Sequence, residues 1–197
     1  MARFHGAAAL AAMAALGLAS GRAHADADFV DEVKFGVLYH DAGIFGDHRE
    51  EGVDLNLDAR FVAPNWLYDE GNPVWLNNLL NPRPNIGASI NTEGDTSEFY
   101  FGLVWEWDLL KEIAQPDDGI FVGFGAGGAV HDGKLDTHES DRKSLGTRVL
   151  FHLSGEIGYR FTERLSLSVY GEHSSNAWLA DRNEGYDNLG LRFGIKF

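Results

Sequence analysis

One short stretch near the end of the chain carries a histidine, two serines, two asparagines and several carboxylates. Residues 170–187 read YGEHSSNAWLADRNEGYD. A serine becomes a nucleophile when a histidine takes its proton and a carboxylate orients that histidine. The stretch therefore contains the three groups that covalent acyl transfer requires, if the fold brings them together.

Segments with strict period-two alternation surround this stretch. In residues 51–61, EGVDLNLDARF, every second residue from Val53 to Phe61 is apolar, and the residues between them are mostly charged. Such alternation is typical of a β-strand with one apolar and one polar face. Together with this segment, the alternation predicts eight strands: Val33–Tyr39, Glu51–Phe61, Ile86–Ile90, Phe99–Trp107, Ile120–Val130, Val149–Phe161, Leu165–Val169 and Leu189–Phe197.

The fold class depends on which face meets water. A soluble sandwich or lipocalin-like barrel turns its polar face outward, whereas an outer-membrane barrel turns its apolar face to lipid. Four features favour the second arrangement: a polar face rich in glycine and charge, aromatic residues at both ends of the apolar row Phe99–Trp107, a tight turn at residues 160–164, and a last strand ending on Phe197. The sequence therefore predicts an all-β protein, an eight-stranded antiparallel transmembrane β-barrel of the outer-membrane type.

The first 25 residues predict a cleaved secretory signal peptide. Arg3 precedes an apolar run over residues 7–19, and AHA at residues 23–25 is followed by acidic residues. The run is short for a membrane-spanning helix, and a charged start with a small-x-small end is typical of a signal. Residues 26–197 then form a single barrel domain in the outer membrane.

Charge and cysteine content narrow the class of partner. Residues 1–25 hold two basic and no acidic residues, so the remaining 14 basic groups face 30 acidic ones, a formal charge of −16. Such acidity argues against a nucleic-acid partner. The chain has no cysteine and so forms no disulfide, although it is predicted to leave the cytoplasm.

Strand parity places three groups of the polar stretch on the outer face. If the strand at residues 165–169 continues without a bulge, His173 and Ser175 point outward, whereas Ser174 points into the lumen. Asp187 shares the parity of the lipid-facing row of the last strand. Setting His173 opposite Asp187 also aligns the apolar rows, with Val169 against Leu191, Leu167 against Phe193 and Leu165 against Ile195. Directly opposed residues have Cβ atoms about 4.5–5.5 Å apart, within reach of a carboxylate–imidazole hydrogen bond.

These residues resemble the signature of the lipid A 3-O-deacylase family, the PagL-like outer-membrane enzymes. The family pattern runs H-x-S-N-A and then N-x-G-x-E, with a glutamate in the place of Asp187. The matching residues here are His173, Ser175, Asn176 and Ala177, then Asn183, Gly185 and Asp187.

The resemblance implies a role for each of five residues. Ser175 would be the nucleophile, His173 the general base and Asp187 the orienting acid. Asn183 would donate to the oxyanion, and Asn176 would be a further oxyanion or substrate-binding residue.

The implied substrate is lipid A or lipopolysaccharide. The enzyme would remove a primary ester-linked acyl chain at the 3-O position, would need no cofactor, and would be surrounded by outer-membrane lipids. Two alternatives remain: a glycerophospholipid esterase, and a non-catalytic small barrel with an adhesion or structural role. A lipid-facing Ser175 within hydrogen-bond reach of His173 favours the enzyme, and a Ser175 in the lumen favours the structural protein. The sequence does not determine the oligomeric state, and a homodimer is compatible with it.

The other histidines and carboxylates of the chain do not form a recognisable metal-binding motif. His40, His131 and His152 have lumen parity, and the carboxylates at residues 116–119 and 136–141 do not follow the spacing of a calcium loop, so we expect no metal. Residues 62–82 are long for a turn on the periplasmic side. Their tryptophans and leucines predict a short helix packed against the rim of the barrel.

Overall fold

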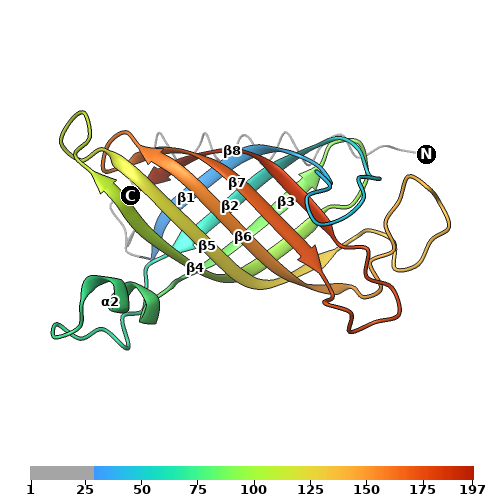
Figure 1. Ribbon diagram of the computed structural model, residues 1–197, viewed down its shortest axis with the longest axis horizontal. Helices are drawn as coiled ribbons and strands as arrows, with labels where there is room; N and C mark the ends of the chain where they lie inside the picture. Colours follow the sequence, from blue (N-terminus) through green and yellow to red (C-terminus); the bar gives the residue numbers. More distant parts are fainter. Residues whose placement is uncertain (1–28) are drawn as a thin grey trace.

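The structure is a computed structural model that describes residues 29–197, so the predicted signal peptide at residues 1–25 lies outside the described part. Eight antiparallel strands close into a barrel in chain order, with β8 beside β1 (Figure 1). This confirms the predicted fold class. The elements are β1 (Val30–Tyr39), β2 (Val53–Phe61), α2 (Val74–Leu80), β3 (Arg83–Asn91), β4 (Glu98–Lys111), β5 (Gly119–His131), β6 (Val149–Arg160), β7 (Leu165–Ser175) and β8 (Tyr186–Lys196).

The connections at the two ends of the barrel differ in length and kind (Figure 1). One end carries loop 1 (residues 40–52), loop 2 (residues 92–97), loop 3 (residues 132–148) and loop 4 (residues 176–185). The opposite end carries two short turns and the α2 segment, which we define as residues 62–82. Loops 1, 3 and 4 surround the candidate site.

Alternate residues of each strand face lipid or lumen as the alternation predicts. In β2, Val53, Leu55 and Leu57 are each about two-fifths exposed, whereas Asp54 and Asp58 are buried. A water-soluble protein would show the reverse pattern, because its apolar side chains leave water when it folds. The outer surface of the barrel is therefore suited to lipid.

Charged side chains fill the lumen and pair with one another. Glu156 accepts hydrogen bonds from Arg60 (2.5 Å), Lys34 (3.0 Å) and Arg192 (3.1 Å), and Arg60 also bonds Asp58 (2.9 Å). An eight-stranded barrel has an interior just wide enough for side chains to fill. Because buried charges are tolerated only when they are paired and hydrogen-bonded, this network accounts for the polar parity of the sequence.

None of the helices within residues 29–197 is long and apolar enough to cross a membrane.

The α2 segment confirms one expectation and contradicts another. A helix is present at Val74–Leu80, but the apolar side chains expected to pack against the rim are mostly exposed. Trp66 is 88% exposed and Trp75 is 60% exposed. The expected packing was wrong because the helix turns its asparagines, rather than its leucines, toward the barrel.

The pairing of β7 with β8 follows the register inferred from the sequence. His173 pairs with Asp187, Val169 with Leu191, Leu167 with Phe193 and Leu165 with Ile195. The β7 strand runs without a bulge to Ser175, so parity is preserved from the apolar row to the polar stretch.

Candidate active site

Ser175, His173 and Asp187 form a continuous hydrogen-bonded chain on the outer face of the barrel. The Ser175 Oγ lies 3.0 Å from His173 Nε2, and His173 Nδ1 lies 2.6 Å from Asp187 Oδ1. The first two residues lie on β7 and the third on β8. The sequence-predicted trio is therefore brought together, and the buried Ser174 is turned into the lumen.

The partners fix which nitrogen of His173 carries the proton. An ionised carboxylate can only accept, so Nδ1 donates to Asp187 and Nε2 is free to accept the hydroxyl proton of Ser175. This is the tautomer in which an imidazole acts as a base toward a serine. The His173 side chain is 26% exposed, so a substrate beside the strand can reach it.

Loop 1 covers Asp187 and fixes its second oxygen. The backbone N–H of Phe45 donates to Asp187 Oδ2 (2.9 Å), and that of Ala42 donates to the Asp187 carbonyl (2.5 Å). The ring of Phe45 contacts His173 edge-on, with centroids 5.4 Å apart. Asp187 is consequently only 1% exposed although it lies on the outer face. Both carboxylate oxygens are held, which orients the acid toward the imidazole.

Asn183 and Asn176 join the two ends of loop 4 in different ways. The Asn183 side-chain oxygen accepts the backbone N–H of Asn176 (2.8 Å), which leaves its NH₂ group as the end that can donate to a ligand. The buried NH₂ of Asn176 donates to the carbonyls of Leu145 (2.9 Å) and Arg182 (2.5 Å). The side-chain donors of Asn176 are thus used within the loops, and they are not available to a substrate.

Loop 4 contains unusual backbone next to the candidate nucleophile. Ala177 and Trp178 have φ values of 52° and 64°, in the left-handed region that non-glycine residues rarely adopt. At Gly185, a Cβ atom would lie 3.0 Å from Ser175 Cβ and 3.2 Å from His173 Cε1. A side chain there would press on both residues, so glycine is needed for the close approach of the loop.

Lys143 of loop 3 connects the loops around the site. This fully buried lysine pairs with Asp41 of loop 1 (2.8 Å) and donates to the Gly185 carbonyl of loop 4 (2.9 Å). Asp41 in turn accepts the backbone N–H groups of Arg49 (2.7 Å) and Glu50 (3.2 Å). A single cation thereby holds the loop that covers Asp187 and the loop that follows Ser175.

A second pair of side chains in loop 1, His40 and Glu50, is ionised over a wide pH range. Burial lowers the pKa of His40, but hydrogen bonds to Asp54 and Glu50 outweigh it and raise that pKa to about 9. Burial raises the pKa of Glu50, but hydrogen bonds from His40, Thr96 and the Lys143 backbone lower it to about 2. The pair is therefore charged near neutral pH.

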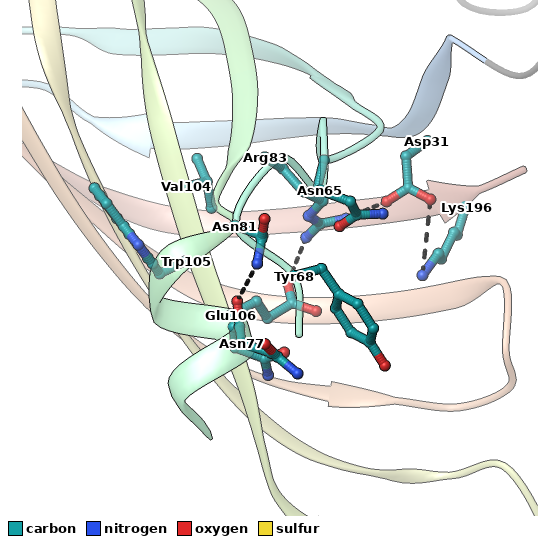
Figure 2. A pocket seen from close by; sticks show the side chains of 12 residues that line it. Asp31, Asn65, Tyr68, Asn77, Asn81, Arg83, Val104, Trp105, Glu106 and Lys196 are labelled. Atoms are coloured by element: carbon teal, nitrogen blue, oxygen red, sulfur yellow. Dashed lines mark hydrogen bonds and ion pairs between the residues drawn. The ribbon is translucent and has the colours of Figure 1, made fainter. Parts of the chain in front are cut away.

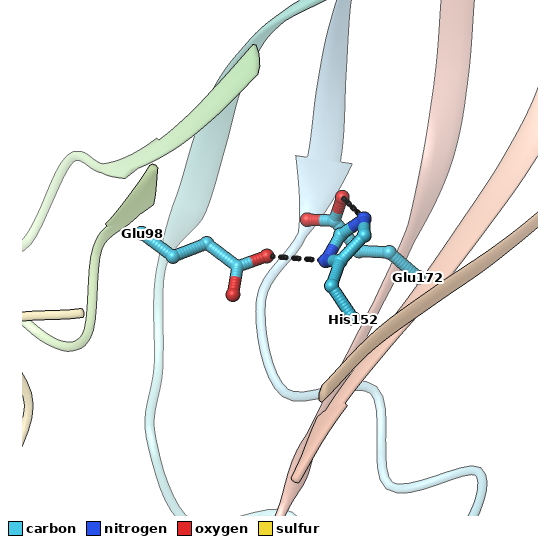
Figure 3. A group of neighbouring side chains, drawn as sticks. All are labelled: Glu98, His152 and Glu172. Carbon is cyan, nitrogen blue, oxygen red and sulfur yellow. Dashed lines mark ion pairs between the residues drawn. The ribbon is translucent and has the colours of Figure 1, made fainter. Parts of the chain in front are cut away.

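One cluster of buried lumen groups has the residue types of a metal site. Glu98, His152 and Glu172 each offer a ligand atom, and these atoms lie within 4.8 Å of one another. Figure 3 shows the carboxylates at different nitrogens of the ring, with Glu98 3.1 Å from Nδ1 and Glu172 3.9 Å from Nε2. Tyr100 stacks on the ring with centroids 4.3 Å apart.

The two carboxylates make their closest contacts with different nitrogens of the His152 ring, whereas a single metal ion would bind one nitrogen together with both carboxylates. Glu98 already accepts from Ser174 and Tyr186, both at 2.7 Å. His40 and His131 are also buried, as their parity predicts. The expectation of no metal stays a prediction.

Comparison with known proteins gives the decisive observation. A profile of the family described as lipid A 3-O-deacylase (PagL) matches residues 66–196, which is more than half of the chain and includes Ser175, His173 and Asp187. The chain belongs to the lipid A 3-O-deacylase family. PagL-family proteins are carboxylic ester hydrolases, so the chain is an enzyme of that class. No curated protein matches the chain.

The chain is also similar to solved structures. The crystal structure of the outer membrane enzyme PagL is 17% identical, with 84% of this chain and 99% of that chain covered at a TM-score of 0.61. Neisserial surface protein A is 10% identical (86% and 96% covered, TM-score 0.46). The N-terminal β-barrel domain of Pseudomonas aeruginosa OprF is 11% identical (85% and 98% covered, TM-score 0.44). The likeness to PagL shows the fold of this family.

The sequence did not indicate the loop residues that support the site. Phe45 and Lys143 lie far along the chain from Asp187 and belong to no spacing pattern in the sequence. Loop 1 has local signals in its glycines, two of which, Gly43 and Gly52, have φ values of 67° and 105°, but these mark turns and not the partners of the loop. The PagL-family motif lies in β7, loop 4 and β8, so it does not extend to these residues either.

Proposed function

We propose that the chain is an outer-membrane lipid A 3-O-deacylase that uses Ser175, His173 and Asp187 on its lipid-facing surface. The observation that carries the proposal is the hydrogen-bonded chain from Ser175 Oγ to Asp187 Oδ1 on the outer face. Family membership supplies the substrate class, a primary acyl ester of lipid A.

The reaction follows from the geometry. Ser175 Oγ attacks the ester carbonyl carbon while His173 Nε2 takes the serine proton. The tetrahedral intermediate then breaks its bond to the sugar oxygen, and His173 returns the proton to that oxygen. A water molecule, deprotonated by His173, then attacks the acyl-serine carbonyl; the bond to Ser175 Oγ breaks, His173 returns the proton to Oγ, and the fatty acid is released. Asp187 stabilises the imidazolium that exists between these steps.

Asn183 is the proposed side-chain donor to the oxyanion. Its oxygen is held by the Asn176 N–H, so its NH₂ group is fixed in direction before substrate arrives. A donor fixed in advance stabilises developing charge without further reorganisation. Asn176 would act only through this backbone contact.

The surface below the triad suits an acyl chain. On the outer face Leu153 pairs with His173, and in the next row Gly155 pairs with Gly171. A Cβ atom at Gly155 would meet no atom within 4 Å. The surface at this position is therefore open, and the packing of the fold does not require glycine there. The neighbours of the two glycines in that row are Phe124 and Leu189. The acyl chain would extend from the ester carbonyl over this part of the sheet. The acyl chains of a membrane lipid already lie beside the strands, so the site requires no deep pocket.

Secretion and membrane placement belong to the same proposal. Cleavage after residue 25 would release the barrel for insertion, and the apolar outer rows would meet lipid. Loops 1, 3 and 4 would then lie at the outer surface, next to the sugar of lipid A.

Mass spectrometry of lipid A tests the proposal. Cells that express the protein should lose one ester-linked acyl chain from the 3-O position, and cells that express Ser175→Ala should not. Unchanged lipid A with folded wild-type barrel would favour the structural alternative. Loss of fatty acid from glycerophospholipid alone would favour the phospholipid esterase.

A further inference from the structure

The α2 segment is a folded unit attached to the wall of the barrel. Asn77 accepts the backbone N–H of Asp69 (3.2 Å) and donates to the Asp69 carbonyl (2.9 Å). The Leu67 N–H donates to Asn81 (3.1 Å). Trp105 of β4 donates its indole N–H to the Leu79 carbonyl (2.9 Å), which fixes the helix against the outer wall.

The two faces of this unit are inverted relative to a helix on a soluble protein. Asn77 and Asn81 line a polar cavity of about 280 Å³, together with Arg83 and Glu106 of the barrel rim (Figure 2). Trp75 and Leu79 lie on the other side of the helix, and the segment has three further exposed apolar residues, Trp66, Leu67 and Val74, of which Val74 is 76% exposed. A helix on a soluble protein turns its apolar stripe toward the protein and its polar face outward. A contiguous apolar surface of this kind marks an interaction site.

The apolar side of the α2 segment continues the lipid-facing surface of the barrel. Trp105 stands in the outer row of β4, with its ring centroid 6.0 Å from that of Phe124 in β5. Since Trp105 also holds Leu79, the exposed side of the segment adjoins this row directly. Tryptophan is enriched at membrane–water interfaces, where one end of the ring is apolar and the other is wet.

We propose that the α2 segment lies in the membrane interface of the leaflet opposite the triad and anchors that end of the barrel to lipid. Its helix has only seven residues, so it can lie on the surface but cannot span the bilayer. The occupant of the apolar side is the boundary between lipid headgroups and acyl chains. This inference goes beyond the proposed reaction and shares with it only the membrane placement of the barrel.

The charge of the segment defines the kind of lipid contact. Residues 62–82 contain Asp69 and Glu70 and no lysine or arginine. Attraction to anionic headgroups requires basic residues, so the contact depends on buried apolar area alone. Binding of the segment is therefore insensitive to the fraction of anionic lipid.

Single-cysteine variants give a direct test, because the chain has no native cysteine. Nitroxide labels at Leu79→Cys and Leu67→Cys report on the apolar side, and a label at Asn78→Cys reports on the cavity side. Leu57→Cys in the outer row of β2 is the reference for lipid contact. The full-length mature barrel is reconstituted in phosphatidylcholine vesicles, and the accessibility of each label to oxygen and to a neutral water-soluble nickel complex is measured.

The expected result separates the two faces. Labels at positions 79 and 67 should have an oxygen-to-nickel accessibility ratio well above that at position 78. The ratio should correspond to a depth of about 5–10 Å below the headgroup boundary. Adding phosphatidylglycerol should leave it unchanged.

Two outcomes would count against the inference. Ratios at positions 79 and 67 equal to that at position 78, with Leu57 in lipid, would overturn it while leaving the barrel and its reaction intact. A marked rise with anionic lipid would overturn the apolar origin of the contact. A water-exposed Leu57 label would instead refute the membrane placement on which the proposed function depends.

Discussion

Replacing Asp187 by asparagine isolates the role of one negative charge. The variant keeps the shape of the side chain, so its oxygen can still accept the Phe45 N–H that now lies 2.9 Å from Oδ2. Its NH₂ group then faces His173 Nδ1 across the present 2.6 Å contact and donates to it. Nδ1 becomes the acceptor, the ring proton moves to Nε2, and Nε2 can no longer take the proton of Ser175.

The magnitude follows from the two available orientations of the amide. Turning it over would restore the tautomer but would set the NH₂ against the Phe45 N–H, and a buried donor without an acceptor costs about 1–3 kcal/mol. That cost alone reduces the population of the productive orientation of the amide by about 5- to 150-fold. Loss of the charge that stabilises the imidazolium adds to it, for a total fall of up to about 10⁴-fold, or about 5.5 kcal/mol in the barrier.

The assay is the initial rate of fatty-acid release from purified lipid A. Asp187→Glu is the matched control, because it keeps the charge and introduces the residue usual in the family, and it should retain substantial activity. Heat-modifiable gel mobility checks that each barrel is folded. If folded Asp187→Asn protein works at near the parental rate, the orienting acid lies elsewhere or the site reduces to a serine–histidine pair.

Further predictions concern the nucleophile, the acyl path and the loops. Ser175→Ala should abolish release of fatty acid with the barrel folded, whereas the lumen variant Ser174→Ala should be mild; equal loss from both would contradict the assignment. Gly155→Leu should lower kcat/KM for a myristoyl ester by about tenfold or more, the effect of about 1.4 kcal/mol of lost contact, and should spare a butyryl ester of the same alcohol; equal effects on both esters would exclude an acyl path there. Loop 1 should be best protected from hydrogen exchange between about pH 4.5 and 6.5. The contribution of Glu50 to loop stability is complete above pH 4.5 and is lost as the pH falls through about 2, and that of His40 is complete below pH 6.5 and is lost as the pH rises through about 9. Protection that grows between pH 6.5 and 9 would contradict this prediction.

Much of the site could be predicted because a strand carries information along its length. Side chains alternate with a period of two, so the apolar residues at 165, 167 and 169 determine the face of His173 and Ser175 several residues later. The register of β7 and β8 followed from matching apolar rows, and it places Asp187 opposite His173. A bulge anywhere between would have reversed the prediction.

Loops carry no such period, which is why the support of the triad was missed. The contact from Phe45 to Asp187 joins residues 142 positions apart, and nothing in the spacing of either segment requires it. The side chain of Lys143 is charged and yet buried, the reverse of what composition suggests for a lysine in a loop. Its burial depends on Asp41 and on a backbone carbonyl, partners that become visible only when three loops converge.

The error at the α2 segment has a different origin, because there the sequence pattern was sound and the assumed solvent was wrong. The tryptophans and leucines were expected to pack on the barrel rim, as they would in water. The strands of the same chain had already indicated that apolar residues face outward, since β2 exposes Leu55 and buries Asp54. An element attached to such a wall meets the same surroundings. Applied consistently, that inversion predicts asparagines toward the rim and tryptophans away from it, which is the arrangement found at Asn77 and Trp75.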